Sequence, residues 1–480
     1  MKSNVAEKKG GQPLYEEVAG RLALMVREGT FRPGEKVPSI RAMSQRLKVS
    51  INTVKTAYGL LEDRRVIEAR PQSGYYVCAR LPAIPREPDV RRPLLNAAAV
   101  EAGEMVSRIM RDVNDPERVQ FGAAIPDPAI LPSEKLGRIM AAEVRRAKGH
   151  GTGYAMGSGL PKLRHQIARH MLKAGVTLAA DEILITSGAS EGVSLAMKVL
   201  CRPGDTVVTG APVYFNFLQL FRELGLKVLE VPSSPVDGIH LDALERALSR
   251  NRVSACLQVT NFNNPLGVSL SEEKKKDLVA LLARYQVPLV EDDINGDIAF
   301  DGRRPGVCKA YDKSGMVILC SSFSKTLAPG YRVGWMVSGR FRERMQRLKM
   351  VSSLATALPP QLAVAEFLAN GGYEHHLRGL GRTCAQRVAA MGEMVGETFP
   401  EGTRVTRPWG GFTLWVEMPQ AVDSMKLYAA VEPMGITVAP GALFSIGDTY
   451  QHYLRLNAAA FTPETRWALK AVGDAARELV

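Results

Sequence analysis

From about residue 115 to the C-terminal end, short apolar runs alternate with helix-like segments. The runs are EILITSG, DTVVTGAP, ACLQVTNF, VPLVEDD and MVILCSSFS, and segments such as SEGVSLAMKVLC lie between them. Strands joined by helices run parallel, because the crossover helix brings the chain back to the same end of the sheet. The pattern therefore predicts an α/β fold with a largely parallel sheet over residues 115–480.

The first 80 residues show a different pattern. Helical spacing of apolar residues predicts a helix over Pro13–Glu28, a short helix over Ile40–Leu47 and a longer one from about Asn52. The β-prone runs VIEA and YYVCA then flank a Pro-Gln-Ser-Gly turn, which is typical of a hairpin. Three helices followed by a two-stranded wing predict a winged helix-turn-helix domain.

A proline-rich stretch separates these two patterns. LPAIPREPDVRRP, from Leu81 to Pro93, contains four prolines and alternating charges. The amphipathic stretch that follows around Ala97–Arg111 is expected to be a helix attached to the next domain. A chain of 480 residues is also too long for one compact core. We therefore expect a tail (1–12), a DNA-binding domain (13–79), a linker (80–114) and a second domain (115–480).

Charge is concentrated at the N-terminal end. The chain carries a formal net charge of +13, and residues 1–80 contribute +7 of it. A basic excess in one sixth of the chain favours a polyanion such as double-stranded DNA as the partner of that end.

The cysteines and the apolar residues exclude other classes of protein. The six cysteines are far apart, with no CxxC pair and no Cys/His cluster, so we expect neither a disulfide framework nor a metal site. No stretch has the ~18 uninterrupted apolar residues of a membrane helix, and MKSNVAEKKGG lacks the apolar segment of a secretory signal. The sequence therefore predicts a cytoplasmic protein.

Polar residues of the predicted helix-turn-helix fall where DNA contacts are expected. The second helix of this motif enters the major groove with its N-terminal residues toward the bases. Ser50 is placed to cap that helix, and the wing tip is small and polar. The candidate DNA-binding residues are Arg41, Ser50, Asn52, Thr53, Lys55, Gln72, Ser73 and Gly74.

The same segment closely resembles the GntR-family DNA-binding domain over about 65 residues. The resemblance lies in PLY, FRPGEKVPSIR, VSINTVKTAYGLL and the wing SGYYV. It implies a winged helix-turn-helix that binds DNA.

The strongest chemical signal is SSFSKTLAPGYRVGW, residues 321–335. Lys325 follows a β-prone run and can form a Schiff base with a carbonyl cofactor, which requires a neutral amine in a desolvated pocket. Ser322, Ser324 and Arg332 supply donors for a phosphate. The pattern indicates a cofactor that carries both a carbonyl group and a phosphate.

Residues 115–480 resemble fold-type I, class I aminotransferases, with motifs in the family's order. The resemblance implies bound pyridoxal 5'-phosphate, and a dimer in which Tyr154 of GYAMGSG reaches the neighbouring subunit's phosphate. Arg455 of YLRLN matches the arginine that binds the substrate carboxylate. The further cofactor contacts implied are Gly188, Ala189 and Ser190 (phosphate), Tyr214 (ring stacking), Asn264 (phenolic oxygen) and Asp292 (ring nitrogen).

One position departs from the family's pattern. Three residues after the ring-nitrogen aspartate, the family has a tyrosine bonded to the phenolic oxygen, and EDDINGD gives Asn295 here. An amide still donates a hydrogen bond, but it is shorter than a phenol. We therefore expect cofactor binding to persist and efficient transamination to suffer.

A GntR-type domain followed by an aminotransferase-like domain is the arrangement of MocR-type regulators. The resemblance implies a dimeric transcription regulator that responds to pyridoxal phosphate or to a small amino compound. One alternative is a working aminotransferase with an appended DNA-binding domain, which acts on an aromatic, branched or α-aminoadipate-like substrate. A third reading is a regulator that has lost the cofactor, and the persistence of every anchoring residue type argues against it.

Overall fold

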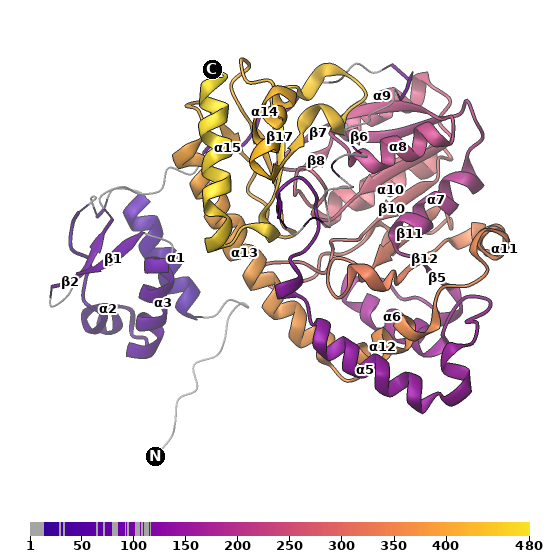
Figure 1. The fold of residues 1–480 in the computed structure, drawn as a ribbon, viewed down its shortest axis with the longest axis horizontal. Coiled ribbons are helices and arrows are strands. Elements are labelled where there is room, and N and C mark those ends of the chain that lie inside the picture. Colours follow the sequence, from indigo (N-terminus) through magenta and orange to yellow (C-terminus); the bar gives the residue numbers. More distant parts are fainter. Residues whose placement is uncertain are drawn as a thin grey trace. The chain divides into compact units, whose positions relative to one another are not determined.

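The computed structural model describes residues 14–27, 30–31, 34–63, 66–70, 73–78, 85–91, 93, 96–100, 106, 109, 115 and 117–480. The chain forms two compact units, Met1–Ile84 and Pro85–Val480 (Figure 1). The predicted tail, residues 1–12, lies outside the described residues.

The first unit is a winged helix-turn-helix, as the sequence predicted. It contains α1 (Leu14–Arg27), α2 (Ile40–Leu47), α3 (Ile51–Asp63), β1 (Ile67–Arg70) and β2 (Gly74–Val77). The strands pair antiparallel, with Ile67 opposite Val77. Both of these residues are buried with Val18, Leu22 and Tyr58 in one core, and the Tyr58 hydroxyl donates to the Pro38 carbonyl at 2.6 Å. This bond fixes α3 against the turn before α2.

Local capping sets the turn between the two central helices. The Ser39 hydroxyl accepts from the Ala42 amide at 3.2 Å at the start of α2, and Lys48, in the left-handed region, ends the helix. The Ser50 hydroxyl accepts from the Thr53 amide at 3.0 Å and begins α3. Because caps satisfy the open backbone groups at helix ends, α2 and α3 stop and start within a few residues of each other.

The second unit is built on one nine-stranded sheet with the order β3-β7-β6-β9-β10-β11-β12-β5, in which β8 pairs with β7. The pairs from β7 to β11 are parallel, and β12 joins β11 and β5 antiparallel. The five apolar runs named from the sequence form β5, β6, β9, β10 and β11. The strands are β3 (Ala98–Ala99), β5 (Ile183–Thr186), β6 (Thr206–Ala211), β7 (Lys227–Ser234), β8 (Gly238–Ile239), β9 (Ala255–Val259), β10 (Leu289–Asp292), β11 (Val317–Ser322) and β12 (Gly334–Val337).

Helices cover both faces of this sheet (Figure 1). Ile318 packs in a cluster with α7 and α8 residues, whereas its neighbour Val317 packs in a cluster with α9 and α10 residues. Successive strand residues point to opposite faces, so a sheet buried on both sides needs continuous apolar runs. The helices are α5 (Ser133–Arg146), α6 (Pro161–Met171), α7 (Ala189–Leu200), α8 (Phe215–Glu223), α9 (Leu241–Arg250), α10 (Glu272–Arg284), α11 (Arg342–Ser353), α12 (Leu358–Ala369), α13 (Gly372–Thr398), α14 (Ser424–Val431) and α15 (Arg466–Glu478).

A smaller sheet completes the unit toward its C-terminal end. Its strands have the order β13-β14-β17-β16, and a separate parallel pair joins β4 to β15. Residues from α13, α14 and α15 bury one side of it. The strands are β4 (Val119–Gln120), β13 (Arg404–Val405), β14 (Thr413–Glu417), β15 (Ile436–Thr437), β16 (Ala439–Pro440) and β17 (Tyr453–Asn457).

Residues 85–91, which fall within the expected linker 80–114, are bonded to the smaller sheet. The Val405 amide donates to the Arg86 carbonyl at 2.8 Å. Arg91 donates to the Glu417 carboxylate at 2.6 Å and to the Tyr453 hydroxyl at 2.9 Å. The proline content of this stretch predicts an extended backbone, but it does not predict which residues that backbone bonds. The sequence therefore indicated a linker and did not reveal its attachment to the sheet. We call residues 85–91 the anchored segment.

The described residues of the stretch 97–111 are only partly helical. Ala98–Ala99 form strand β3 rather than part of a helix, whereas Val106 and Ile109 are helical and buried.

Among the described residues, no helix has the length and apolar character needed to cross a membrane.

Candidate cofactor and DNA-binding sites

A cavity lies where the carboxyl ends of the central parallel strands meet, the place where open α/β sheets bind ligands. Asp292 ends β10, Lys325 follows β11, Ser190 lies in the first turn of α7, and Tyr214 directly precedes α8. The lining residues are Ala124, Ala189, Ser190, Tyr214, Phe217, Val259, Asn264, Asp292, Ile294, Asn295, Ser324, Lys325, Arg332, Phe412 and Thr413.

Lys325 is the lysine among these lining residues. Its Nζ donates to the Ala124 carbonyl at 2.6 Å. Burial, followed by the charge of Arg455, lowers its pKa to about 8 against the opposing attraction of Asp292. At pH 7 an amine with a pKa of about 8 is neutral in about a tenth of molecules, far more than at the ordinary pKa of 10.5. The neutral amine is the nucleophile that attacks a carbonyl.

Asp292 lies buried at the end of its strand. Its Oδ1 accepts from the Ile294 amide at 3.1 Å. Burial raises the pKa of this carboxyl to about 7, although that amide and the charge of Lys325 oppose the shift. A protonated ring nitrogen beside Asp292 would supply the positive charge that favours the ionised carboxylate.

The N-terminus of α7 forms a cradle suited to phosphate. No side chain caps this helix, so its first backbone N–H groups are open to an anion. Gly188 has φ +83°, and a Cβ there would lie 2.3 Å from Nη2 of Arg332. Arg332 itself donates to the Ser324 hydroxyl at 3.1 Å and to the Ser187 carbonyl at 3.0 Å. The cradle therefore needs glycine at position 188.

The side chain of Asn264, which lines the cavity, has open bonding capacity. Asn264 Oδ1 is buried and has no hydrogen-bond partner among the described residues. An orphaned acceptor costs free energy unless a ligand satisfies it. Together with the cradle, Asp292 and Lys325, this acceptor makes the residues fit pyridoxal phosphate, which combines a phosphate, a pyridine nitrogen, a phenol and an aldehyde.

Asn295 lines the same cavity but is already engaged. Its Nδ2 donates to the Phe262 carbonyl at 2.9 Å, and the residue is 8% exposed. One of its two N–H groups is thus committed to the backbone. Asn295 can therefore donate fewer hydrogen bonds to a ligand than the sequence led us to expect.

Arg455 on β17 is fully buried, close enough to Lys325 for its charge to lower the lysine's pKa. One terminal nitrogen, Nη2, donates to the Gly122 carbonyl, whereas Nε and Nη1 have no partner among the described residues. Burial lowers its pKa to about 10, so the guanidinium stays charged at neutral pH. A buried guanidinium with two unpartnered nitrogens can bind a carboxylate.

Other predicted site residues lie around the cavity rather than in its lining. The Ser322 hydroxyl forms a hydrogen bond with the Ser324 hydroxyl at 2.8 Å and donates to the Val333 carbonyl at 3.0 Å. Ser322 therefore stabilises the loop after β11. Tyr154 is 78% exposed and does not line this cavity within its own chain.

The sequence motifs missed four lining residues, which belong to no motif and reach the cavity through packing: Ala124, Phe217, Phe412 and Thr413.

The predicted DNA-binding residues lie mostly on the surface of the first unit. Arg41 on α2 and Asn52 and Lys55 on α3 are exposed. The hydroxyls of Ser50 and Thr53 bond each other at 2.8 Å. In the wing, Ser73 Oγ bonds the Tyr76 hydroxyl at 2.6 Å, Gly74 has φ +109°, and Gln72 lies outside the described residues. All three hydroxyl residues thus bond within the unit, Ser50 and Thr53 at the start of α3 and Ser73 in the wing.

Within the described residues, no group of three or more His, Cys, Asp or Glu side chains is placed to hold a metal ion.

Comparisons with known proteins agree with this division of the chain. Residues 14–77 match the family described as bacterial regulatory proteins, gntR family, and residues 129–469 match aminotransferase class I and II. Two uncharacterized HTH-type transcriptional regulators of Escherichia coli K12, YjiR and YdcR, are 37% and 36% identical over 96% and 93% of this chain, and over 98% and 95% of their own lengths.

Solved structures are similar to the second unit. A multiple substrate aminotransferase from Thermococcus profundus has a TM-score of 0.73 at 26% identity, covering 79% of this chain and 96% of that one. The α-aminoadipate aminotransferase LysN from Thermus thermophilus, complexed with N-(5'-phosphopyridoxyl)-L-leucine, has a TM-score of 0.71 at 28% identity, covering 79% and 97%.

Proposed function

The chain belongs to the aminotransferase class I and II family and carries a gntR-family domain, the architecture of MocR-type transcription regulators, and from this we propose how the two parts work together. An amino compound with a carboxylate binds at the pyridoxal phosphate site and changes the affinity of a dimer for DNA. The regulator acts in the cytoplasm, where its DNA lies.

The observation that carries this proposal is the free bonding capacity of Arg455. Its Nε and Nη1 are buried without a partner among the described residues, near the amine of Lys325. A ligand with a carboxylate for Arg455 and an amine for the cofactor would satisfy both. When bound, pyridoxal phosphate supplies an aldehyde that reacts with amines and a ring that accepts electrons. Lys325 would hold it covalently, and Asp292, Asn264 and the Gly188–Ser190 turn would orient it.

The dimer is proposed from one exposed surface. Tyr154 is 78%, Met156 55% and Val351 75% exposed. The Gln346 side chain of α11 bonds the Ser158 hydroxyl at 3.0 Å, which ties the loop that carries Tyr154 and Met156 to the helix that carries Val351. A second copy of the chain would cover these apolar groups and bring Tyr154 to the partner's phosphate cradle.

Adding the right amino compound should therefore change two signals at once. We expect a shift of the visible absorption band of the bound cofactor and, at the same ligand concentration, a change in DNA affinity. Amino acids are screened by absorbance and then by a binding assay on the protein's own upstream DNA. Arg455→Gln should weaken the response about tenfold or more, as loss of a charged hydrogen bond does. An amino compound that shifts the band yet leaves DNA binding unchanged would contradict the proposal.

The alternative function, a working aminotransferase, is tested at Asn295. We expect wild-type turnover with ordinary amino acids and 2-oxoglutarate to stay well below the enzyme median of ~10 s⁻¹, because the Asn295 amide is bonded to Phe262. Asn295→Tyr should raise turnover about tenfold, the effect of one added hydrogen bond to a charged group. Asn295→Phe is the control, since it adds the ring without the hydroxyl. Steady turnover near the median in the wild type would favour the enzyme.

A further inference from the structure

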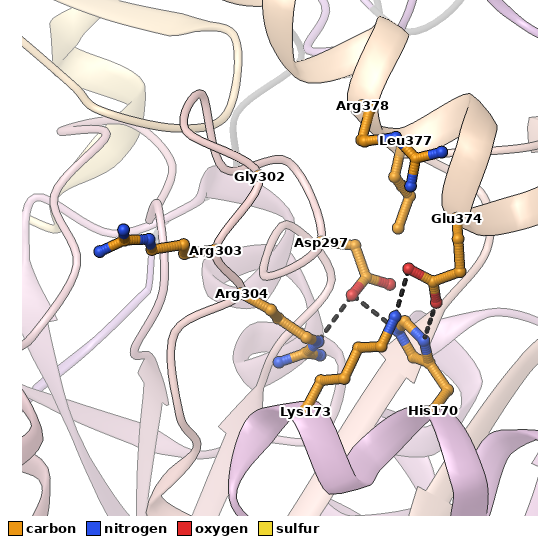
Figure 2. Close-up of a pocket in the computed structure, with 9 residues that line it drawn as sticks. All are labelled: His170, Lys173, Asp297, Gly302, Arg303, Arg304, Glu374, Leu377 and Arg378. Atoms are coloured by element: carbon orange, nitrogen blue, oxygen red, sulfur yellow. Dashed lines mark hydrogen bonds and ion pairs between the residues drawn. The ribbon is translucent and has the colours of Figure 1, made fainter. Parts of the chain in front are cut away.

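A second cavity, of about 500 Å³, lies apart from the cofactor cavity and shares no lining residue with it. Three segments distant in sequence form it: the end of α6 with Lys173, the loop 297–304, and the first turns of α13 (Figure 2). This volume is within the ~300–1,000 Å³ of small-molecule sites. The cavity is thus large enough for a metabolite-sized ligand.

A chain of ion pairs forms the floor of the cavity (Figure 2). The side chains of His170, Asp297 and Arg304 are largely buried, whereas those of Lys173 and Glu374 are partly exposed. His170 Nε2 lies 2.8 Å from Asp297 Oδ1, and its Nδ1 lies 3.4 Å from Glu374 Oε1. Arg304 donates to Asp297 at 2.6 Å, and Lys173 pairs with Glu374. Burial lowers the pKa of His170, but the two carboxylates outweigh burial and raise it to about 9. His170 is therefore a cation at neutral pH.

The charges of this floor cancel one another. The three cations His170, Lys173 and Arg304 are matched by three carboxylates, those of Asp297, Glu374 and Asp293, the last of which pairs with Arg304. Buried charges of this kind need such pairing.

Two further lining guanidiniums have no such match. Arg303 and Arg378 are exposed, and neither pairs with a carboxylate in the part of the chain that the structure describes. Arg378 lies on α13 one turn beyond Glu374, whereas the Arg303 side chain points away from the Asp297 cluster and would turn inward to meet a ligand (Figure 2). An anion with two charges would balance the cavity, and planar guanidiniums bind carboxylate and phosphate in bidentate geometry.

The floor also connects to the cofactor site. Asp297 Oδ2 accepts from the Tyr373 hydroxyl at 2.6 Å, and that hydroxyl bonds Thr326 Oγ1 at 3.0 Å. Thr326 directly follows Lys325. Arg304, which pairs with Asp297, also forms an ion pair with Asp293, the residue after Asp292. A change at Asp297 thus reaches the neighbours of both Lys325 and Asp292.

We propose that this cavity is a second ligand site, which takes a small dianion such as a phosphate monoester or a dicarboxylate and acts on the cofactor site through Asp297 and Tyr373. The binding part of this proposal, that the cavity takes a dianion, is inferred from the cavity alone. The coupling part, that the dianion affects the cofactor site, rests on the proposed function because it requires a bound cofactor.

Titration of the cofactor-loaded full-length protein with inorganic phosphate tests the binding part. The loaded protein is required because its own phosphate cradle is then occupied. Calorimetry at constant ionic strength should show one saturable site, and the double variant Arg303→Gln/Arg378→Gln should weaken it at least about tenfold. Arg382→Gln, which removes an exposed arginine one turn further along α13, is the matched control and should leave the site unchanged.

Succinate, titrated in the same way, distinguishes a dicarboxylate ligand from a phosphate. Arginine-dependent binding of either probe supports the site. No saturable binding of either, or equal loss in the Arg382→Gln control, overturns it.

The coupling part has its own measurement. Phosphate should change the visible band of the bound cofactor in the wild type. In Tyr373→Phe it should bind within about twofold of the wild-type affinity and leave the band unchanged, since the link from Asp297 to Thr326 is broken. A band that does not respond in the wild type, or responds equally in the variant, refutes the coupling. Failure of the proposed function would appear elsewhere, as DNA affinity that ignores amino compounds.

Discussion

Lys325→Ala should abolish covalent attachment of pyridoxal phosphate. Lys325 is the lysine that lines the cofactor cavity, and burial with nearby Arg455 lowers its pKa to about 8, so the amine is available to react. After borohydride treatment, the intact mass of the wild type should rise by one pyridoxyl phosphate group, and the mass of the variant should not change. The visible band of the bound cofactor should be lost or moved in the variant.

Lys198→Ala is the matched control for this experiment. Lys198 lies on α7, the helix whose N-terminus forms the phosphate cradle, but its side chain is exposed. Its loss should leave labelling intact. If Lys325→Ala still carries a reducible group on another lysine, the assignment of the site is wrong.

Removing residues 1–84 should eliminate sequence-specific DNA binding. The first unit contains the winged helix-turn-helix, and residues 1–80 carry +7 of the +13 net charge. Specific binding by such proteins exceeds their non-specific binding by about a thousandfold or more, so the loss should be of that order. A binding assay over a range of salt concentrations measures it, and the intact protein should show the steep salt dependence of phosphate contacts.

Single substitutions separate base reading from charge within this unit. Arg41→Ala should weaken binding by ~1–3 kcal/mol if the guanidinium contacts a guanine edge, and discrimination should then relax at one base pair. Asn52→Ala should change sequence preference more than total affinity, because no charge is lost. Lys426→Ala, which removes an exposed lysine of α14 in the second unit, is the control.

For the deletion, unchanged DNA affinity after removal of residues 1–84 would contradict the helix-turn-helix assignment.

Local sequence was enough to predict the helices and wing of the first unit, five strands of the large sheet and the motifs of the cofactor cavity. The five apolar runs became strands because the central strands of a sheet buried on both faces are mostly apolar. Asp292, Lys325 and Ser190 meet in one cavity because each follows or begins an element at the same edge of the sheet. Such placement follows from topology, which the alternation of strands and helices already sets.

Contacts between distant segments were beyond the reach of motifs. His170, Asp297 and Glu374 come from three segments more than 70 residues apart, and no spacing rule links them. The bond that occupies the Asn295 amide depends on the position of the Phe262 carbonyl, 33 residues earlier in the chain. Side-chain packing decides both, and the sequence pattern describes only which face of an element is apolar.

The anchored segment limits how far each DNA-binding module can travel. Cys78 is the last described residue of the first unit and Pro85 begins the second. Covalent geometry alone restricts the seven residue steps between them to a span of about 25 Å. In a dimer, two modules on tethers this short would find their second half-site at a local concentration in the millimolar range. Half-sites whose separation exceeds the combined reach of the two tethers would be bound by one module only, so inserted base pairs should cause an abrupt loss of affinity.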